Sequence, residues 1–277
     1  MEEFDYKGYL SKIGICKGDI VDVASDLLSF MIYCRQKKLK FNPNHFIDIL
    51  LDLIGEEGTV LIRTFTWAFC RGDTFDILNT PSEVGSLGNI AMKRDDFKRT
   101  KHPIYSWSVY GKDQDYLISL NNSDSFGCNT PWEYFCNNNA KLVLLGNTDV
   151  LAITVIHHFE QILNVPYRAN KIFESEYINE LGEHSIRRYS MFVSPLNIKT
   201  ENFIDKWWSE IVNKYDINKE ILFDSFLKGN YFNYKDIEKF ATEEINNFYS
   251  EHIWMFDGLR GYNNPNLNWN TARYYRI

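Results

Sequence analysis

The stretch Thr59-Val-Leu-Ile-Arg-Thr-Phe65 carries the strongest buried-strand signal in the sequence, and the fold prediction starts from it. A short, nearly continuous apolar run of this kind is typical of a strand that is covered on both faces. Upstream, Asp19-Ile-Val-Asp-Val23 predicts another strand, and two helices are predicted in between, from Leu27 to Leu39 and from His45 to Ile54. Strand, helix, helix and strand at this spacing predict a parallel crossover and hence an α/β fold.

Downstream of this unit the pattern continues with further strands and helices. The predicted elements are strands at Tyr105 to Tyr110 and Lys141 to Gly146, a helix from Val150 to Leu163, strands at Ile172 to Tyr177 and Ser185 to Phe192, and helices from Glu201 to Tyr215 and Ile237 to Tyr249. The tail from Asn263 to Thr271 is expected to be irregular. We therefore predict a mixed central sheet flanked by helices, spanning residues 1–170, with a smaller C-terminal α+β lobe, residues 171–277, packed on it.

Composition and charge exclude several classes of partner. The 277 residues carry a net charge of −7, which argues against a nucleic acid or an anionic membrane because such partners need clustered Lys and Arg. The five Cys are scattered and form no C-x-x-C pair, so neither a zinc ribbon nor a disulfide framework is predicted. The N-terminus has no apolar signal segment, and no apolar run approaches the roughly 20 residues that span a bilayer. We expect a cytoplasmic protein.

His102 is the first candidate for chemistry. It follows a basic loop and precedes Pro103 and a predicted strand, which places it at a strand entrance, where a side chain can face a cleft. An imidazole with a near-neutral pKa can remove a proton from an attacking group. Asp96, six residues earlier, can orient this imidazole or accept a proton itself. The alternatives are a histidine that is hydrogen-bonded in a loop and a solvated acid at a helix end.

The pair His157 and His158, followed by Glu160, offers the residue types of a metal site. Adjacent residues on a helix point about 100° apart, however, and H-E-x-x-H spacing is absent. We therefore predict that no metal is bound. Glu160 lies one turn after His157, so these two side chains can share a helix face.

Gly85-Ser-Leu-Gly88 is a turn of small residues, which permits the close approach of an extended ligand arm. The sequence has no G-x-x-x-x-G-K-[ST], no G-x-G-x-x-G and no G-x-S-x-G motif. Neither an ATP-binding P-loop, nor a dinucleotide fold, nor a hydrolase nucleophile elbow is therefore supported.

Taken in order, a series of sequence blocks is more specific than any of these signals. The blocks are Gly18 to Leu27, Gly55 to Trp67, Phe75-Asp76, Thr80 to Ser82, Gly85 to Leu87, Arg99-Thr-Lys-His-Pro103 with Ser106 and Gly111, Phe126-Gly127, Thr130-Pro131, Lys141 to Gly146, Thr154 to Glu160, and Val165-Pro-Tyr167. This series resembles the aminoglycoside 3-N-acetyltransferase family over roughly residues 14–170.

The resemblance implies transfer of an acyl group from acyl-CoA, the cosubstrate, to an amine by direct attack on the thioester. It implies that the general base is His102, assisted by an acid at Glu160 or Glu133, the positions that match. The residues implied for the CoA side are Ser25, Asp26 and Leu27 in the first strand-to-helix turn and Thr64, Phe65 and Thr66 at a strand end, with Gly85 and Ser86 flanking the pantetheine arm. The smaller lobe is expected to complete the acceptor cleft.

One departure from the family pattern bears on the acceptor. Members that act on antibiotics usually have His-Ser-Ser or His-Thr-Ser where this chain has Ala24-Ser25-Asp26. We therefore predict an acceptor of another branch, a nucleotide-linked amino deoxysugar such as a dTDP-4-amino-4,6-dideoxyhexose, as in anthrose-pathway N-acyltransferases. The residues expected to hold the nucleotide are Trp67, Trp107 and Trp132, by stacking, and Arg71 and Arg99, by clamping a pyrophosphate.

Two alternatives stay open at this point: an aminoglycoside 3-N-acetyltransferase that modifies antibiotics, and a sugar-nucleotide-binding module without catalysis. In each case the partner is a small molecule, and the sequence is compatible with a homo-oligomer.

Overall fold

The computed structural model describes residues 2–148, 152–165, 168–194, 200–202, 213–217, 220–224, 226–248 and 254–256. Its central element is a seven-stranded mixed sheet in the order β10-β11-β6-β1-β2-β5-β4. The strands are β10 (Ile221–Leu222), β11 (Lys228–Asn233), β6 (Lys141–Leu145), β1 (Ile20–Ser25), β2 (Thr59–Arg63), β5 (Trp107–Gly111) and β4 (Lys98–Arg99). β1 pairs in parallel with both β2 and β6, and the outer strands are antiparallel to their neighbours. The predicted parallel crossover from β1 to β2 is confirmed.

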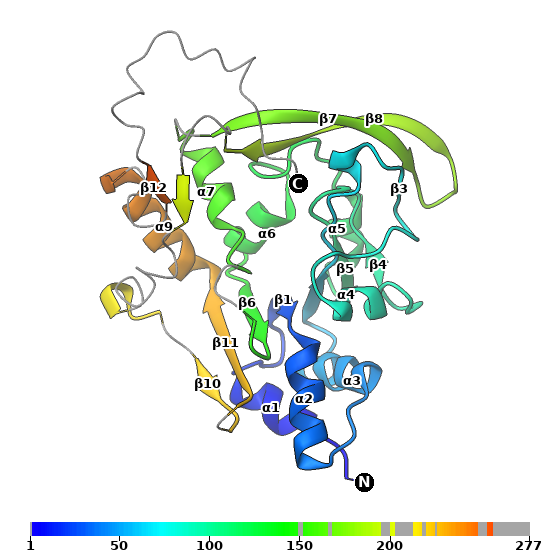
Figure 1. The fold of residues 1–277 in the computed structure, drawn as a ribbon, viewed down its shortest axis with the longest axis vertical. Coiled ribbons are helices and arrows are strands. Elements are labelled where there is room, and N and C mark those ends of the chain that lie inside the picture. The colour runs from blue at the N-terminus through cyan, green and yellow to red at the C-terminus, as the bar shows by residue number, and fades with distance from the viewer. Residues whose placement is uncertain are drawn as a thin grey trace.

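Helices cover both faces of this sheet (Figure 1). Val21 and Val23 of β1 pack in one hydrophobic cluster with α1 (Tyr6–Lys12), α2 (Leu27–Lys37), α3 (Pro43–Ile54) and α4 (Ser86–Ala91). The alternate strand residues, such as Leu61 and Leu144, face a second cluster with α6 (Pro131–Asn137), α7 (Ile156–Ile162) and α9 (Tyr234–Phe248). Because successive side chains of a strand point to opposite faces, strands this apolar need cover on both sides.

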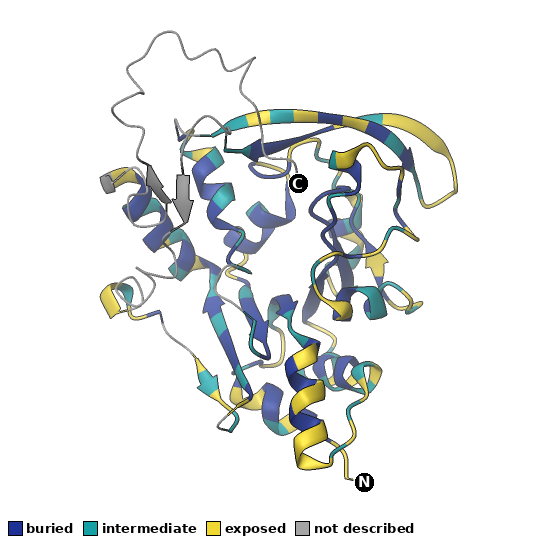
Figure 2. Cartoon of the chain, in the orientation of Figure 1, coloured by how far each residue is buried: buried dark blue, intermediate teal, exposed yellow. Residues whose placement is uncertain are grey.

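A smaller three-stranded sheet has the order β3-β7-β8 and comprises β3 (Phe75–Asp76), β7 (Ala169–Ile178) and β8 (His184–Val193). β7 and β8 form a long hairpin that arches across one end of the molecule (Figure 1). Its inner residues, including Tyr177 and Tyr189, are buried, whereas the end of the hairpin is exposed (Figure 2). The described residues also form a pair of short strands, β9 (Thr200–Asn202) and β12 (Trp254–Phe256), and a short helix, α5 (Gln114–Ser119).

The fold class is confirmed: a mixed sheet flanked by helices, with a smaller sheet beside it. The expected boundary at residue 170 is not a spatial division, because β10 and β11 extend the central sheet through the pairing of β11 with β6. The predicted helix from Glu201 to Tyr215 lies mostly outside the described residues, and its first two residues belong to β9. The tail from Asn263 to Thr271 lies outside them as well.

No helix in the described part of the chain is long and apolar enough to cross a membrane.

Candidate active site

A pocket of about 390 Å³ opens at the carboxyl ends of the parallel strands β1 and β2. It is lined by Ala24, Ser25, Arg63, Phe65, Trp67, Val84, Gly85, Tyr105, Thr148, Ala152, Thr154 and His157. Ligands of α/β sheets bind at this edge, where crossovers leave in opposite directions from neighbouring strands. β1 is such a strand, because the chain continues to β2 on one side of β1 and later adds β6 on its other side.

Gly85 brings the loop before α4 against the end of β1. Its φ of +79° lies in the left-handed region, and a Cβ at this position would stand 2.9 Å from the carbonyl oxygen of Ser25. Only glycine satisfies both conditions without a shift of the backbone. The close approach that the sequence predicted at Gly85 is therefore made by the protein's own chain, at the end of β1. This contact forms one wall of the pocket.

His157 is the ionisable side chain of the pocket that can exchange a proton near neutral pH. The Nδ1 atom of His157 lies 2.6 Å from Oε2 of Glu160, one turn further along α7, as the shared helix face predicted. Glu160 is fully buried and also forms an ion pair with Nε of Arg168 at 2.7 Å. An Nδ1–H that donates to a carboxylate leaves Nε2 as the basic nitrogen. The pair thus provides an oriented base on the pocket wall.

The surroundings keep this imidazole neutral. Burial lowers the pKa of His157, and the positive charge of Arg168 lowers it further. The negative charge of Glu160 and its hydrogen bond act in the opposite direction, but the pKa remains below its ordinary value. At neutral pH His157 is therefore unprotonated and able to accept a proton.

Arg63 connects the pocket to the interior of the sheet. Its Nε and Nη2 atoms donate to the two carboxylate oxygens of Asp22 at 3.0 and 2.6 Å, and both side chains are buried. Asp22 also accepts hydrogen bonds from Trp107 Nε1 and from the hydroxyl of Tyr234. The third donor of the guanidinium, Nη1, reaches the carbonyl oxygen of Ala152 at 2.5 Å. Arg63 thereby fixes the segment that precedes α7.

His102, the predicted base, has a different position. It is 2% exposed, and its Nδ1 accepts hydrogen bonds from the backbone N–H groups of Ile104 and Tyr105. Its ring packs edge-on against Tyr189, and burial lowers its pKa to about 3. His102 is not among the residues that line the pocket. His102 thus holds the turn that leads into β5 and lies away from the pocket wall, and its role as the base stays a prediction.

The predicted acids Asp96 and Glu133 are engaged elsewhere. Asp96 accepts two hydrogen bonds from Arg94 at the surface, and this contact lowers the pKa of the carboxyl group. Glu133 lies in the first turn of α6 and accepts a hydrogen bond from the backbone N–H of Asn129 at 2.7 Å. Neither lines the pocket. Glu160 is the predicted acid that the structure brings to the site, and it contacts His157 rather than His102.

Of the residues predicted for the CoA side, Ser25, Phe65 and Gly85 line the pocket. The others are not among its lining residues: Asp26, Leu27, Thr64, Thr66 and Ser86. Asp26 caps α2, because its carboxylate accepts the N–H groups of Leu28 and Ser29. The carboxylate of Asp26 thus already occupies these two N–H groups of the turn.

Thr64 and Thr66 are fully buried and use their hydroxyls internally. The Thr64 hydroxyl lies 2.9 Å from that of Ser106, and the Thr66 hydroxyl accepts the backbone N–H of Ala68. These residues shape the strand end without facing the pocket.

The residues expected to hold a nucleotide are mostly inaccessible. Trp107 and Trp132 are fully buried, so neither can stack on a base. Arg99 is 7% exposed and donates to the carbonyl oxygens of Thr64 and Thr80 within the protein. Arg71 is partly exposed and forms ion pairs with Glu83 and Asp73. Only Trp67 reaches the pocket, so the side chains on which the nucleotide prediction rested do not form a nucleotide site.

Several lining residues could not be predicted from the sequence, among them Arg63, Tyr105, Thr148, Ala152 and Thr154. None belongs to a motif with its own chemistry. The signal in the sequence for this site is the spacing of His157 and Glu160, which places both side chains on one helix face. Within the described residues, no group of three or more His, Cys, Asp or Glu side chains is arranged to hold a metal ion. The absence of a metal requirement stays a prediction.

Comparisons with known proteins agree with this fold. The family described as aminoglycoside 3-N-acetyltransferase matches residues 34–217. This match covers more than half of the chain, which therefore belongs to that family of N-acetyltransferases. Comparison with curated protein sequences gave no significant match.

Several solved structures have a similar fold. The aminoglycoside acetyltransferase AAC(3)-Xa has a TM-score of 0.70 and 17% identity, over 90% of this chain and 92% of its own. AAC-IIIb, solved as a binary complex with CoASH, has a TM-score of 0.70 and 17% identity, over 89% and 96%. The YokD protein from Bacillus subtilis has a TM-score of 0.67 and 20% identity, over 87% and 98%. These likenesses establish the fold.

Proposed function

We propose that this protein transfers an acyl group from acyl-CoA to an amino group of a sugar, with His157 as the general base. The observation that carries the proposal is the His157–Glu160 pair on the wall of the pocket at the carboxyl ends of β1 and β2. A neutral imidazole held by a buried carboxylate is the arrangement that removes a proton from an attacking nucleophile.

In the proposed reaction the amine nitrogen attacks the thioester carbonyl carbon while Nε2 of His157 takes a proton from the nitrogen. The carbon–sulfur bond then breaks, the amide forms, and CoA leaves as a thiolate that recovers a proton. Glu160 holds the imidazole in the tautomer that presents Nε2 and stabilises the imidazolium once it forms. The rate gain from such a base is typically about 10² to 10⁴, and alignment of the two substrates adds more.

Acyl-CoA is proposed as the donor because the chain belongs to an N-acetyltransferase family and because a structure of similar fold holds CoASH. Ser25, Phe65 and Gly85 are proposed to contact the pantetheine arm, since they line the pocket on the side of β1 and β2. Gly85 and the short chain of Ser25 leave room for an extended, narrow ligand.

The acceptor is proposed to be an aminoglycoside or a closely related amino sugar rather than a nucleotide-linked one. The family supports this choice, and burial of Trp107, Trp132 and Arg99 removes the main support for a nucleotide. The net charge of −7 also suits a polycationic acceptor. The Ala24-Ser25-Asp26 turn still departs from the antibiotic-acting pattern, so a nucleotide-linked amino sugar is the second candidate.

The decisive experiment measures thiol release from acetyl-CoA with a panel of amino sugars, for the wild type and two variants. Asn can replace the Nδ1–H of a histidine but has no atom at the position of Nε2. His157→Asn should therefore lower kcat by about 10² or more while CoA binding persists. His158→Asn is the matched control, because His158 does not line the pocket and its Nδ1 accepts the N–H of Gly127, which Asn Oδ1 can also do.

Equal activity of His157→Asn and wild type would overturn the assignment of the base. Acetylation of a nucleotide-linked amino sugar but of no aminoglycoside would overturn the proposed acceptor and leave the assignment of the base intact.

A further inference from the structure

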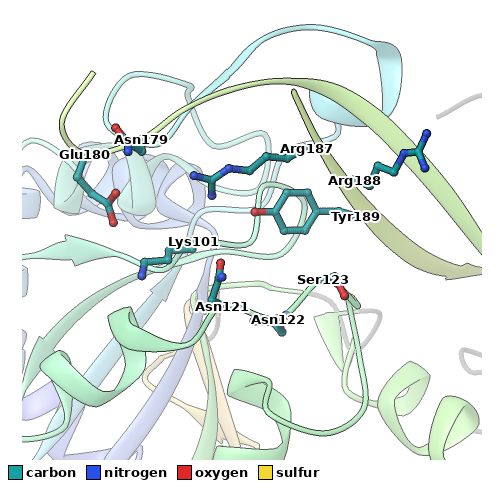
Figure 3. A pocket seen from close by; sticks show the side chains of 9 residues that line it. All are labelled: Lys101, Asn121, Asn122, Ser123, Asn179, Glu180, Arg187, Arg188 and Tyr189. Carbon is teal, nitrogen blue, oxygen red and sulfur yellow. The ribbon is translucent and has the colours of Figure 1, made fainter. Parts of the chain in front are cut away.

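A second pocket, of about 430 Å³, lies beneath the β7–β8 hairpin (Figure 3). Every residue that lines it has a polar side chain: Lys101, Asn121, Asn122, Ser123, Asn179, Glu180, Arg187, Arg188 and Tyr189. None of them lines the first pocket, so the two pockets are separate sites. Its size and its convergent polar groups are those of a small-molecule site.

Two positive charges, those of Arg187 and Lys101, face this pocket. Figure 3 shows the guanidinium of Arg187 and the hydroxyl of Tyr189 reaching in from the hairpin, with Lys101 and Asn121 on the opposite wall. Neither Arg187 nor Lys101 forms an ion pair with any described carboxylate within 4.0 Å. The neighbouring Arg188 points away from Arg187 in Figure 3 and pairs with Glu174.

Arg187 is held in place by uncharged groups. Its Nε donates to the hydroxyl of Ser185 at 3.0 Å, and its guanidinium carbon lies 4.0 Å from the centre of the Tyr177 ring. A guanidinium fixed in this way keeps its charge and most of its donors available to a ligand. Because its orientation is already fixed, binding costs little side-chain entropy.

The opposite wall is fixed as well. The carbonyl oxygen of Lys101 accepts the hydroxyl of Tyr177 at 2.9 Å. The carbonyl oxygen of Ser123 accepts the backbone N–H of Ser190 on β8 at 2.8 Å. The loop that carries Asn121 and Asn122 is thereby tied to the hairpin that carries Arg187. The pocket is thus built from rigid walls with amide donors beside two cations.

One carboxylate, Glu180, also lines the pocket, at the turn of the hairpin (Figure 3). With Lys101 and Arg187 opposing it, the lining keeps a positive balance even though the whole protein is acidic. Two cations, a phenol hydroxyl and amide donors together match the oxygens of a tetrahedral oxyanion. A carboxylate beside them can accept hydroxyl groups of the same ligand.

From this arrangement we propose that the cavity beneath the hairpin binds the phosphate group of a small phosphorylated ligand, with Arg187 and Lys101 as its charged contacts. The acyl-transfer assignment is not needed for this proposal. Three sources share the chemistry, namely inorganic phosphate, a sugar phosphate and the 3′-phosphate of CoA.

The test is calorimetric titration of the full-length protein with inorganic phosphate, glucose 6-phosphate, glucose, and CoA against 3′-dephospho-CoA. We expect saturable phosphate binding with a Kd of about 1 mM or lower. Lys101→Gln and Arg187→Gln should each weaken it by about tenfold or more, whereas Lys112→Gln, a control at an exposed lysine outside this pocket, should not change it.

The comparison of these ligands identifies which of the three phosphate compounds the pocket binds. Tighter binding of glucose 6-phosphate than of inorganic phosphate, with no binding of glucose, assigns the site to a sugar phosphate. Loss of CoA affinity in Lys101→Gln that is absent with 3′-dephospho-CoA assigns it to the cosubstrate. Binding of inorganic phosphate as tight as that of glucose 6-phosphate, with CoA affinity unchanged in both variants, assigns it to the free ion.

Absence of saturable phosphate binding, or an equal loss in Lys112→Gln, would overturn the proposal. Thermal unfolding of each variant controls for stability. The Arg187 side chain contacts Tyr177 and Ser185, whereas Lys101 contacts Tyr177 through its backbone carbonyl, which Lys101→Gln leaves in place; this variant keeps the test valid if Arg187→Gln unfolds.

Discussion

Replacement of Glu160 by Gln tests the proposed site directly. The change removes one negative charge 2.6 Å from Nδ1 of His157 and keeps the shape of the side chain. Since the charge of Glu160 raises the pKa of His157 and burial lowers it, the variant should have a still lower imidazole pKa. The acid limb of the pH profile of kcat/KM should therefore move to lower pH.

The size of the rate loss follows from the same geometry. Each unit of pKa corresponds to about 1.4 kcal/mol of stabilisation of the imidazolium that forms during the reaction. Gln can also present its amide nitrogen to Nδ1 and so favour the wrong tautomer. Loss of an orienting carboxylate costs up to about 10⁴ in serine proteases. A fall in kcat of about 10² to 10³ is expected here, because the Gln oxygen can still accept a hydrogen bond.

The variant also leaves Arg168 without its charged partner, so some loss of stability is expected. Steady-state thiol release across pH 5 to 9, with thermal unfolding alongside, separates the two effects. Glu133→Gln is the matched control, since Glu133 meets a backbone N–H outside the pocket and its loss should leave kcat unchanged. A kcat within about threefold of wild type and an unshifted pH profile for Glu160→Gln would refute the proposed role.

Three further predictions follow from the framework of the site. His102→Asn should keep activity within a few-fold of wild type. It should also make the protein less sensitive to acid, because a histidine whose pKa falls from 6.5 to about 3 on folding destabilises the folded state as pH drops below 6.5. Urea unfolding of both proteins at pH 4.5 and 7 would show this difference. Asp22→Asn should cost about 3 to 5 kcal/mol in denaturant unfolding, because it leaves the Arg63 guanidinium buried without a counter-charge, and a loss under 1 kcal/mol would contradict this. Gly85→Ala should raise KM for acetyl-CoA more than it lowers kcat, because its Cβ would meet the carbonyl oxygen of Ser25 at 2.9 Å; an unchanged KM would show that this wall does not contact the cosubstrate.

The residues themselves determined the sheet core and the side of the molecule on which the site lies. Continuous apolar strands such as Thr59–Arg63 can only be buried on both faces, so the crossover and the α/β class follow from local pattern. The spacing of His157 and Glu160 fixes their contact, because residues three apart on a helix share a face whatever surrounds them. Gly85 could likewise be predicted, since a turn of small residues indicates close backbone approach.

Which histidine faces the pocket was decided only by the tertiary structure. His102 and His157 look alike in sequence, but burial depends on segments far away along the chain, such as the hairpin that places Tyr189 on His102. The same long-range packing buries Trp107 and Arg99, brings Asp22 against Arg63 and Tyr234, and adds β11 to the central sheet. Local sequence fixes which side chains can do chemistry, whereas desolvation by distant elements determines which of them reach a ligand.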